Sequence, residues 1–138
     1  MALSDLDILS LIPQRPPFVF VSRLLTADET HAVAEYTIPA DCPLLQGERF
    51  TTAGLLENMA QTCAARIGYL QVAQQQPVRI GYIGALNPLD VHAWPQAGDT
   101  ITCEVVLTES VFDISLFHCT SRRGDTLLAE GNLKLALI

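Results

Sequence analysis

The spacing of hydrophobic residues along the chain changes twice, and it predicts strands on both sides of one long helix. Residues 18–26 and 30–38 are rich in β-branched and aromatic side chains, with a turn candidate at 27–29, so they predict a β-hairpin. From residue 53 to residue 73 the apolar positions recur at helical spacing. After Pro77 the strand pattern returns, in residues 78–85, 89–93, 100–108, 112–121 and 126–137.

Capping and turn residues set the expected ends of these elements. Ser4, followed by Asp5 and Asp7, is typical of an N-cap, so a short helix is expected over residues 4–11, before Pro13. Either of two threonines would cap the long helix, Thr51 or Thr52. Glycine, proline and polar residues predict loops or turns at 39–52, 94–99, 109–110 and 122–125.

The long helix has few charges for its length. Glu57 and Arg66 are the two charged residues in about 20 positions, and several glycines and alanines keep the helix thin. A helix this apolar is expected to be buried on most sides. The face that we expect to be buried is formed by Leu56, Met59, Ala60, Cys63, Ala64 and Ile67.

This order of elements predicts an α+β fold. The economical arrangement is one domain over residues 1–138, in which an antiparallel sheet wraps around the single central helix. That arrangement is the hotdog fold. Since one sheet leaves the flanks of the helix and the edge of the sheet uncovered, we expect at least a dimer, either a homodimer or a larger assembly.

Composition narrows the class of protein. The 138 residues are 49% hydrophobic and 17% charged, which excludes intrinsic disorder, and no apolar run reaches the ~18 residues of a membrane span. A net charge of −7 argues against nucleic acid and anionic membranes as partners. The acidic N-terminus does not resemble a signal peptide, so we expect a cytoplasmic protein.

The cysteines and histidines do not predict a metal site or a bound cofactor. Cys42, Cys63, Cys103 and Cys119 lack C-x-x-C spacing, and the three histidines are scattered. Cys63 and Cys119 fall in apolar patterns, so we expect reduced thiols in the core.

Five segments resemble FabZ-type 3-hydroxyacyl-[acyl-carrier-protein] dehydratases. Residues 11–25, LIPQRPPFVFVSRLL, are similar to the L-P-H-R-x-P-F-L-L-V-D-R opening of that family, and residues 54–61, GLLENMAQ, are similar to the L-x-x-E-A-M-A-Q of its central helix. The other three are C-P-L-L-Q-G (42–47), P-x-x-G-D (95–99) and A-E-G-N-L-K (129–134). They span most of the chain in the family's order, which implies the hotdog fold and a thioester substrate carried by acyl-carrier protein or CoA.

One departure bears on the chemistry. The family's G-H-F-P segment supplies a catalytic histidine, whereas Glu48 follows Gly47 here and the segment is about five residues shorter. The shortened form resembles the dehydratase-like proteins of aryl-polyene and related pigment clusters. This difference puts in question dehydration by the chain alone, and a partner dehydratase subunit would supply the histidine.

Glu57 is the principal catalytic candidate. A carboxyl on so apolar a helix is expected to be desolvated and to serve as acid or base near neutral pH; the alternative is a solvated or salt-bridged flank residue. The resemblance implies that a histidine of the other subunit takes the α-proton of a 3-hydroxyacyl thioester while this carboxyl protonates the leaving hydroxyl.

Three further residues are weighed as site residues. Gln61, one turn from Glu57, would orient the carboxyl or the substrate, or else satisfy a loop backbone. Gly54 would offer free backbone N–H groups to a thioester carbonyl oxygen, or else serve only packing. Glu48 would act as a second carboxylate base, or else be solvated.

Other polar residues carry weaker signals. His92 and His118 are interpreted as core or edge residues rather than site residues. Arginines could receive a phosphate or an acidic carrier protein, the alternative being scattered surface charge. The candidates are Arg15, Arg23, Arg49, Arg79, Arg122 and Arg123. Three functions remain open: an acyl-thioester dehydratase, a non-catalytic hotdog subunit that binds acyl chains or supports a partner, and an acyl thioesterase.

Overall fold

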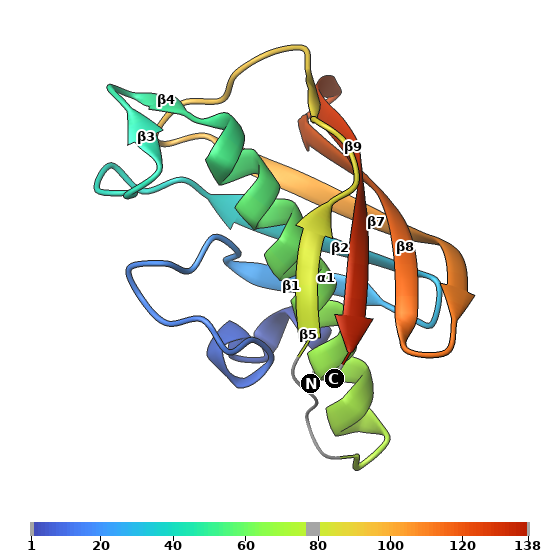
Figure 1. The fold of residues 1–138 in the computed structure, drawn as a ribbon. Helices are drawn as coiled ribbons and strands as arrows, with labels where there is room; N and C mark the ends of the chain where they lie inside the picture. Colours follow the sequence, from blue (N-terminus) through green and yellow to red (C-terminus); the bar gives the residue numbers. More distant parts are fainter. Residues whose placement is uncertain (1, 77–80, 138) are drawn as a thin grey trace.

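A computed structural model describes residues 2–76 and 81–137 of the chain. One α-helix, α1 (Thr52–Ala73), lies against a large antiparallel sheet that curves around it (Figure 1). The path of the sheet is β1-β2-β7-β8-β9-β5, and β6 pairs with β9 beside β5. The bounds of these strands are Arg23–Ala27 (β1), His31–Thr37 (β2), Gly81–Ala85 (β5), Asp90–Val91 (β6), Thr100–Val111 (β7), Ile114–Arg123 (β8) and Thr126–Leu137 (β9). The predicted α+β hotdog arrangement is confirmed.

The core lies between α1 and the concave side of the sheet. Met59 and Cys63 of the helix are fully buried, together with Cys103 and Cys119 on the two central strands. All four cysteines of the chain are buried and free, as expected for Cys63 and Cys119. The buried face predicted for α1 is only partly correct. Four members of that face, Leu56, Ala60, Ala64 and Ile67, are half-buried rather than buried.

The N-terminal segment differs from the predicted helix. It contains two short 3-10 turns, Leu3–Asp5 and Ile8–Ser10, and Asp7 rather than Ser4 caps with its side chain, which accepts the N–H of Leu9. A single helix over so few residues before Pro13 gains too few backbone hydrogen bonds to offset nucleation. Residues 9–15, here called the arm, then run alongside α1.

Several strand boundaries were also predicted wrongly, among them those of β8, which spans Ile114–Arg123 rather than residues 112–121. β1 begins at Arg23 rather than at residue 18, because side chains of α1 bind the backbone of Phe18 and Phe20 in place of a neighbouring strand. β7 continues through the predicted turn at 109–110, and the chain reverses at Phe112, where φ is +53°. A bulge between Leu107 and Glu109 absorbs the change of register.

The predicted loop 39–52 contains a small hairpin. Strands β3 (Leu45–Gln46) and β4 (Arg49–Phe50) pair across a turn at Gly47, whose φ of +63° suits glycine. Thr51 caps α1 as one of the two expected threonines, and its Oγ1 accepts the N–H of Gly54 at 3.2 Å. The part of the strand predicted at 78–80 lies outside the described residues. No helix in the described part of the chain is long and apolar enough to cross a membrane.

Candidate active site

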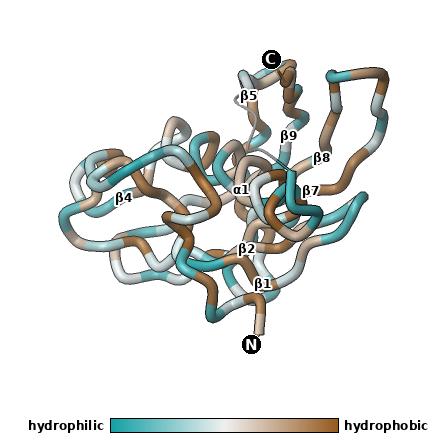
Figure 2. The backbone as a smooth tube through the Cα atoms, turned by 90° about the horizontal axis from the view of Figure 1, so that it is seen from below, coloured by the Kyte–Doolittle hydropathy of each residue, from teal (hydrophilic) through white to brown (hydrophobic). Residues whose placement is uncertain are grey.

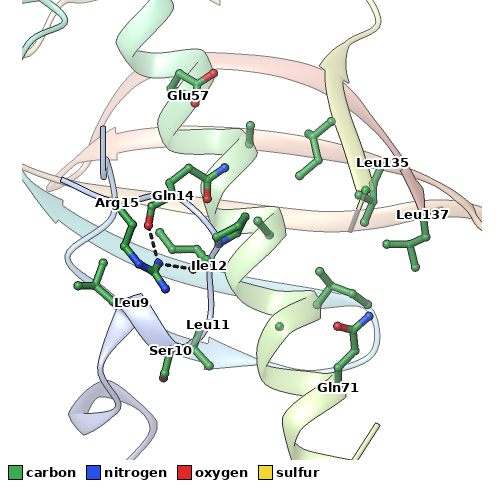
Figure 3. Close-up of a pocket in the computed structure, with 17 residues that line it drawn as sticks. Leu9, Ser10, Leu11, Ile12, Gln14, Arg15, Glu57, Gln71, Leu135 and Leu137 are labelled. Carbon is green, nitrogen blue, oxygen red and sulfur yellow. Dashed lines mark hydrogen bonds between the residues drawn. The ribbon is translucent and has the colours of Figure 1, made fainter. Parts of the chain in front are cut away.

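The side of α1 that faces away from the sheet forms the floor of a cavity of about 460 Å³. Its walls come from the arm on one side of the helix and from β5 and β9 on the other (Figure 3). From the helix, Glu57, Ala60, Ala64, Ile67, Gly68 and Gln71 line the cavity. Glu57 and Gln71 stand at opposite ends of this stretch, which is about 21 Å long at 1.5 Å per residue.

The arm can approach α1 closely because of Gly68. A Cβ at this position would lie 2.0 Å from the carbonyl oxygen of Leu11, so glycine alone allows the contact. Together with Ala60 and Ala64, Gly68 keeps the floor of the cavity low. The small residues that the sequence placed on this helix therefore leave space for a ligand as well as for packing.

Glu57 is exposed in the single chain, which corrects the expectation that it is desolvated. It lies on the helix face that the sheet does not cover, where only a ligand or a second subunit would exclude water. Its Oε2 accepts a hydrogen bond of 3.4 Å from Nε2 of Gln61. Glu57 and Arg15 are the charged side chains among the described residues that line the cavity.

Gln61 is buried, with 1% of its surface exposed, and it binds the loop backbone, one of the two roles weighed from the sequence. Its Oε1 accepts the N–H of Phe20 at 2.7 Å, and its Nε2 donates to the carbonyl of Phe18 at 3.0 Å. The same Nε2 reaches Glu57. Gln61 thus ties the loop backbone to α1 and also contacts the Glu57 carboxyl.

Sequence reasoning missed Asn58 and Arg66, which also tie loops to the helix. Nδ2 of Asn58 donates to the carbonyl of Phe20 at 2.6 Å. Arg66 is 6% exposed, donates to the carbonyls of Asp28 and Glu29, and lies over the ring of Phe117. Asn58 and Arg66 are polar residues on an otherwise apolar helix, and they lie opposite loops that have no partner strand. These two features were the signal that could have identified them.

The structure does not bring Glu48 and Gly54 into the cavity lining. Glu48 is exposed in the β3–β4 turn. The N–H of Gly54 is bound by Thr51, which contradicts the expectation of a free N–H there, and a Cβ on Gly54 would lie 2.4 Å from the Phe50 ring. Close packing against Phe50 explains this glycine.

The histidines lie away from the cavity and bind other groups. His31 contacts Glu104 at 2.7 Å and His92 contacts Glu130 at 3.3 Å. Nδ1 of His118 lies 3.0 Å from Oδ1 of Asn132. No histidine is found among the described residues that line the cavity.

Neither a metal nor a thiol nucleophile fits this site. Within residues 2–76 and 81–137 no three His, Cys, Asp or Glu side chains are grouped as metal ligands. Burial raises the pKa of the Cys103 thiol, and a hydrogen bond with Cys63, together with burial, raises that of Cys119. Such thiols are poor nucleophiles at neutral pH. The cavity is elongated and mostly apolar, and Glu57 lies at one of its ends.

The predicted arginine candidates are dispersed. Arg23 pairs with Glu35 and Arg123 with Asp99, while Arg49 lies over the Trp94 ring at 4.4 Å. Arg122 is exposed, and Arg79 lies outside the described residues. Arg15 is the one candidate that lines the cavity in the described part of the chain.

Comparisons with known proteins agree with this picture. A family model described as ApeP dehydratase, of the ApeP-like family, matches residues 6–137. The 3-hydroxyacyl-[acyl-carrier-protein] dehydratase FabZ of Natranaerobius thermophilus is 30% identical, over 96% of this chain and 95% of that protein. FabZ of Clostridioides difficile is 25% identical over the same shares.

Solved structures share the fold. The dehydratase heterocomplex ApeI:P from Xenorhabdus doucetiae has a TM-score of 0.81 at 16% identity, covering 96% of this chain and 91% of that one. The fluoroacetyl-CoA thioesterase FlK has a TM-score of 0.62 at 14% identity, covering 78% of this chain and 84% of that one. At these identities the two matches speak for the fold alone.

Proposed function

Because the chain belongs to the ApeP-like dehydratase family, we propose that it is a subunit of a 3-hydroxyacyl-thioester dehydratase in which Glu57 is the acid. The observation that carries the proposal is the position of Glu57 at one end of the elongated cavity, held by Gln61. The substrate would be carried by acyl-carrier protein or CoA, in fatty-acid or polyene-type biosynthesis in the cytoplasm.

The proposed reaction needs a base as well as an acid. A base removes a proton from C2 of the thioester, the C3–O bond breaks, and the Glu57 carboxyl gives its proton to the departing hydroxyl. The products are water and the 2-enoyl thioester. Since no histidine lines the cavity in the described part of the chain, the base would come from a second hotdog subunit. That subunit would also cover Glu57 and so desolvate its carboxyl.

The alternative base within the chain is Glu48. Its position in the β3–β4 turn, outside the cavity lining, favours the partner histidine over this carboxylate. If Glu48 takes part in the reaction, it does so only after binding of a partner moves the hairpin toward the cavity.

The proposal is tested by turnover of a 3-hydroxyacyl-carrier-protein thioester. We expect enoyl product from the chain combined with a histidine-bearing hotdog subunit. Glu57→Gln should lower that rate by about 10²–10⁴-fold, the usual effect of losing a general acid. Glu109→Gln, an exposed carboxylate on β7, is the matched control and should leave the rate unchanged.

Other outcomes assign the alternatives. Release of free thiol without enoyl product would make the chain a thioesterase. A complex that keeps its full rate with Glu57→Gln would make it a non-catalytic subunit, and absence of any product with every candidate partner would contradict dehydration.

A further inference from the structure

The face of the sheet that points away from α1 carries a group of adjoining apolar side chains. Side chains alternate between the two faces of a strand, and Phe117 of β8 and Leu135 of β9 are buried on the helix side. Their neighbours in sequence therefore point outward. The register aligns four outward residues in one row, one each from β5, β9, β8 and β7, with Leu116 of β8 in the next row. The outer patch, as we call this group, consists of Tyr82, Ala136, Ile114, Val111 and Leu116.

The outer patch is open to solvent in the single chain. Tyr82 is 72% exposed, Val111 53% and Ile114 43%. Strands about 4.8 Å apart, with residues about 3.4 Å apart along each strand, give the patch a width of about 14 Å and a height of about 7 Å. Adjoining apolar side chains with polar residues around them are typical of an interaction surface. A patch of this size is small for a permanent interface, so we expect reversible association.

The turn between β7 and β8 adds a second observation beside the outer patch. Phe112 is fully exposed, and its φ of +53° lies in the left-handed region that two-residue turns usually fill with glycine or asparagine. Figure 2 shows this hairpin extending away from α1, next to the ends of β5 and β9. An aromatic side chain at such a position is strained and also leaves apolar surface in water. Contact with another protein would remove the second of these costs.

The charges around the outer patch indicate which kind of protein covers it. In the row of Leu116, Lys134 of β9 lies on one side and Glu109 of β7 on the other, and both are exposed. Asp113 in the turn is a further acid. With one basic and two acidic residues, the patch has no surplus of positive charge, which an acidic partner or an anionic membrane would require.

A basic and an acidic residue on either side of an apolar centre match a second copy of the same surface. When two copies pack with these faces together around a two-fold axis along β8, the strands of one copy lie in reverse order over those of the other. Because β9 and β7 flank β8 on its two sides, Lys134 of each copy then lies over Glu109 of the other. Ile114 and Leu116 meet their own counterparts on the axis. Two ion pairs thus border an apolar contact.

Charges further along β8 limit the contact to the end of the sheet near the turn. Thr120, four residues after Leu116, lies between Glu104 of β7 and Glu130 of β9. The same axis would bring these glutamates together as like charges, which is unfavourable. Packed sheets cross at about 30°, so the two copies separate with distance from their point of contact. The outer patch can therefore pair while the glutamates stay apart.

We propose that two copies of this chain associate through the outer patch, around a two-fold axis along β8, with Phe112 extending the apolar contact. The cavity and Glu57 lie on the other side of the sheet, and the backbone edge of β5 is not part of the contact. The chain can therefore bind a hotdog partner and a second copy of itself at the same time. The inference goes beyond the proposed function, because it holds whether or not the chain takes part in dehydration.

Exchanging the two charges tests the proposal, with the association of the full chain measured by analytical ultracentrifugation. Lys134→Glu should weaken association about tenfold, because it sets two carboxylates opposite each other. Glu109→Lys should weaken it similarly, although it makes the chain less acidic and so lowers the general repulsion between copies. The double variant with both changes should restore the Kd of the unaltered chain. Asp125→Lys, which changes the charge equally in the β8–β9 turn, is the control and should not weaken association.

A cysteine on the axis gives a second test, which does not depend on charge. Sheets packed face to face lie about 10 Å apart, a span that a short bismaleimide bridges. Leu116→Cys should therefore give a crosslinked product of twice the mass of the chain, whereas Asp125→Cys, beyond the far end of β8, should give none. The four native cysteines are buried and do not compete for the reagent.

Two results would overturn the proposal. One is a double variant that associates as weakly as the single variants although its Tm is unchanged, and the other is a failure of Leu116→Cys to crosslink. Protection of the Leu116→Cys thiol by acyl-carrier protein, without a crosslinked pair, would assign the outer patch to that partner instead. Since the patch lies away from the cavity, these variants should keep the dehydration rate, as expected above for Glu109→Gln.

Discussion

Gln61 links the candidate acid to the segment that covers the helix. It is buried and makes hydrogen bonds to the backbone of Phe18 and Phe20 and to Glu57. Its helical spacing to Glu57 identified this residue, and the geometry adds that it also binds the backbone of the loop. Structural and positioning roles at this residue can therefore be separated only by measuring both.

Replacing Gln61 by leucine is expected to lower the free energy of unfolding by about 3 kcal/mol. The variant leaves the Phe20 N–H buried without a partner, which costs about 1–3 kcal/mol, and it removes the part-buried hydrogen bond to the Phe18 carbonyl, which contributes about 1 kcal/mol. Urea denaturation measures the change. Gln74→Leu, at the exposed end of α1, is the control and should change stability by less than about 0.5 kcal/mol. Equal stability of the two variants would show that the hydrogen bonds contribute little.

At the scale of elements, the sequence predicted the helix and most strands, because periodicity reports burial directly. It predicted α1 nearly to its ends and gave Thr51 as one of two candidate caps. The predicted start of β1 was wrong because side chains of α1, rather than a neighbouring strand, bind the backbone of Phe18 and Phe20. The predicted end of β7 was wrong because a bulge lets this strand continue past residue 109. The uncovered flanks of α1 were expected, but not which residues lie on them, since periodicity does not show which apolar face the sheet covers.

Asp99 joins loop 94–99 to the sheet by a hydrogen bond from Arg123 of β8, and the strength of this contact should depend on pH. The hydrogen bond from the Gln96 N–H, followed by that from Arg123, holds the pKa of Asp99 below its usual 3.8. A lowered pKa in the folded state means that the stabilisation is present above about pH 4 and is lost as the pH falls through the folded-state value. Asp99→Asn should therefore lower Tm at pH 6 and have a smaller effect near pH 3.

Thermal melts at several pH values check this expectation. Asp125→Asn, an exposed acid in the neighbouring β8–β9 turn, serves as the control. If the difference in Tm between Asp99→Asn and the unaltered chain stayed constant down to pH 3, the carboxylate would not be the stabilising group.

In the whole molecule, the face of α1 that the sheet leaves uncovered lies on the same side as the edge strand β5. The order of strands ends at β5, whose segment Gly81–Ala85 is apolar, and Figure 2 shows β5 next to β9 at the margin of the sheet. Tyr82 of this strand is 72% exposed. An edge strand without charges is a template for pairing with another chain. The same β5 forms part of the cavity wall, so a subunit paired there would lie beside the cavity.

If a second subunit pairs with the edge of β5, the backbone N–H of Ala85 should contribute to the association. Backbone N–H groups alternate in direction along a strand, and the N–H of Leu86 donates to Asn132 on the β9 side. The N–H of Ala85 therefore points to the open margin. Ala85→Pro removes this donor without breaking a bond to β9, and it should weaken association of the chain with itself or with a hotdog partner by about tenfold.

Analytical ultracentrifugation measures that association, and Ala85→Gly, which keeps the N–H, is the matched control. If the proline variant associates as tightly as the glycine variant, the second subunit does not pair with β5. The second subunit would then have to cover Glu57 by packing against α1 and the arm, without extending the sheet. A different result would be that Ala85→Pro dissociates the complex and abolishes dehydration while the Tm of the chain is unchanged. Pairing at β5 would then be the step by which the partner completes the site.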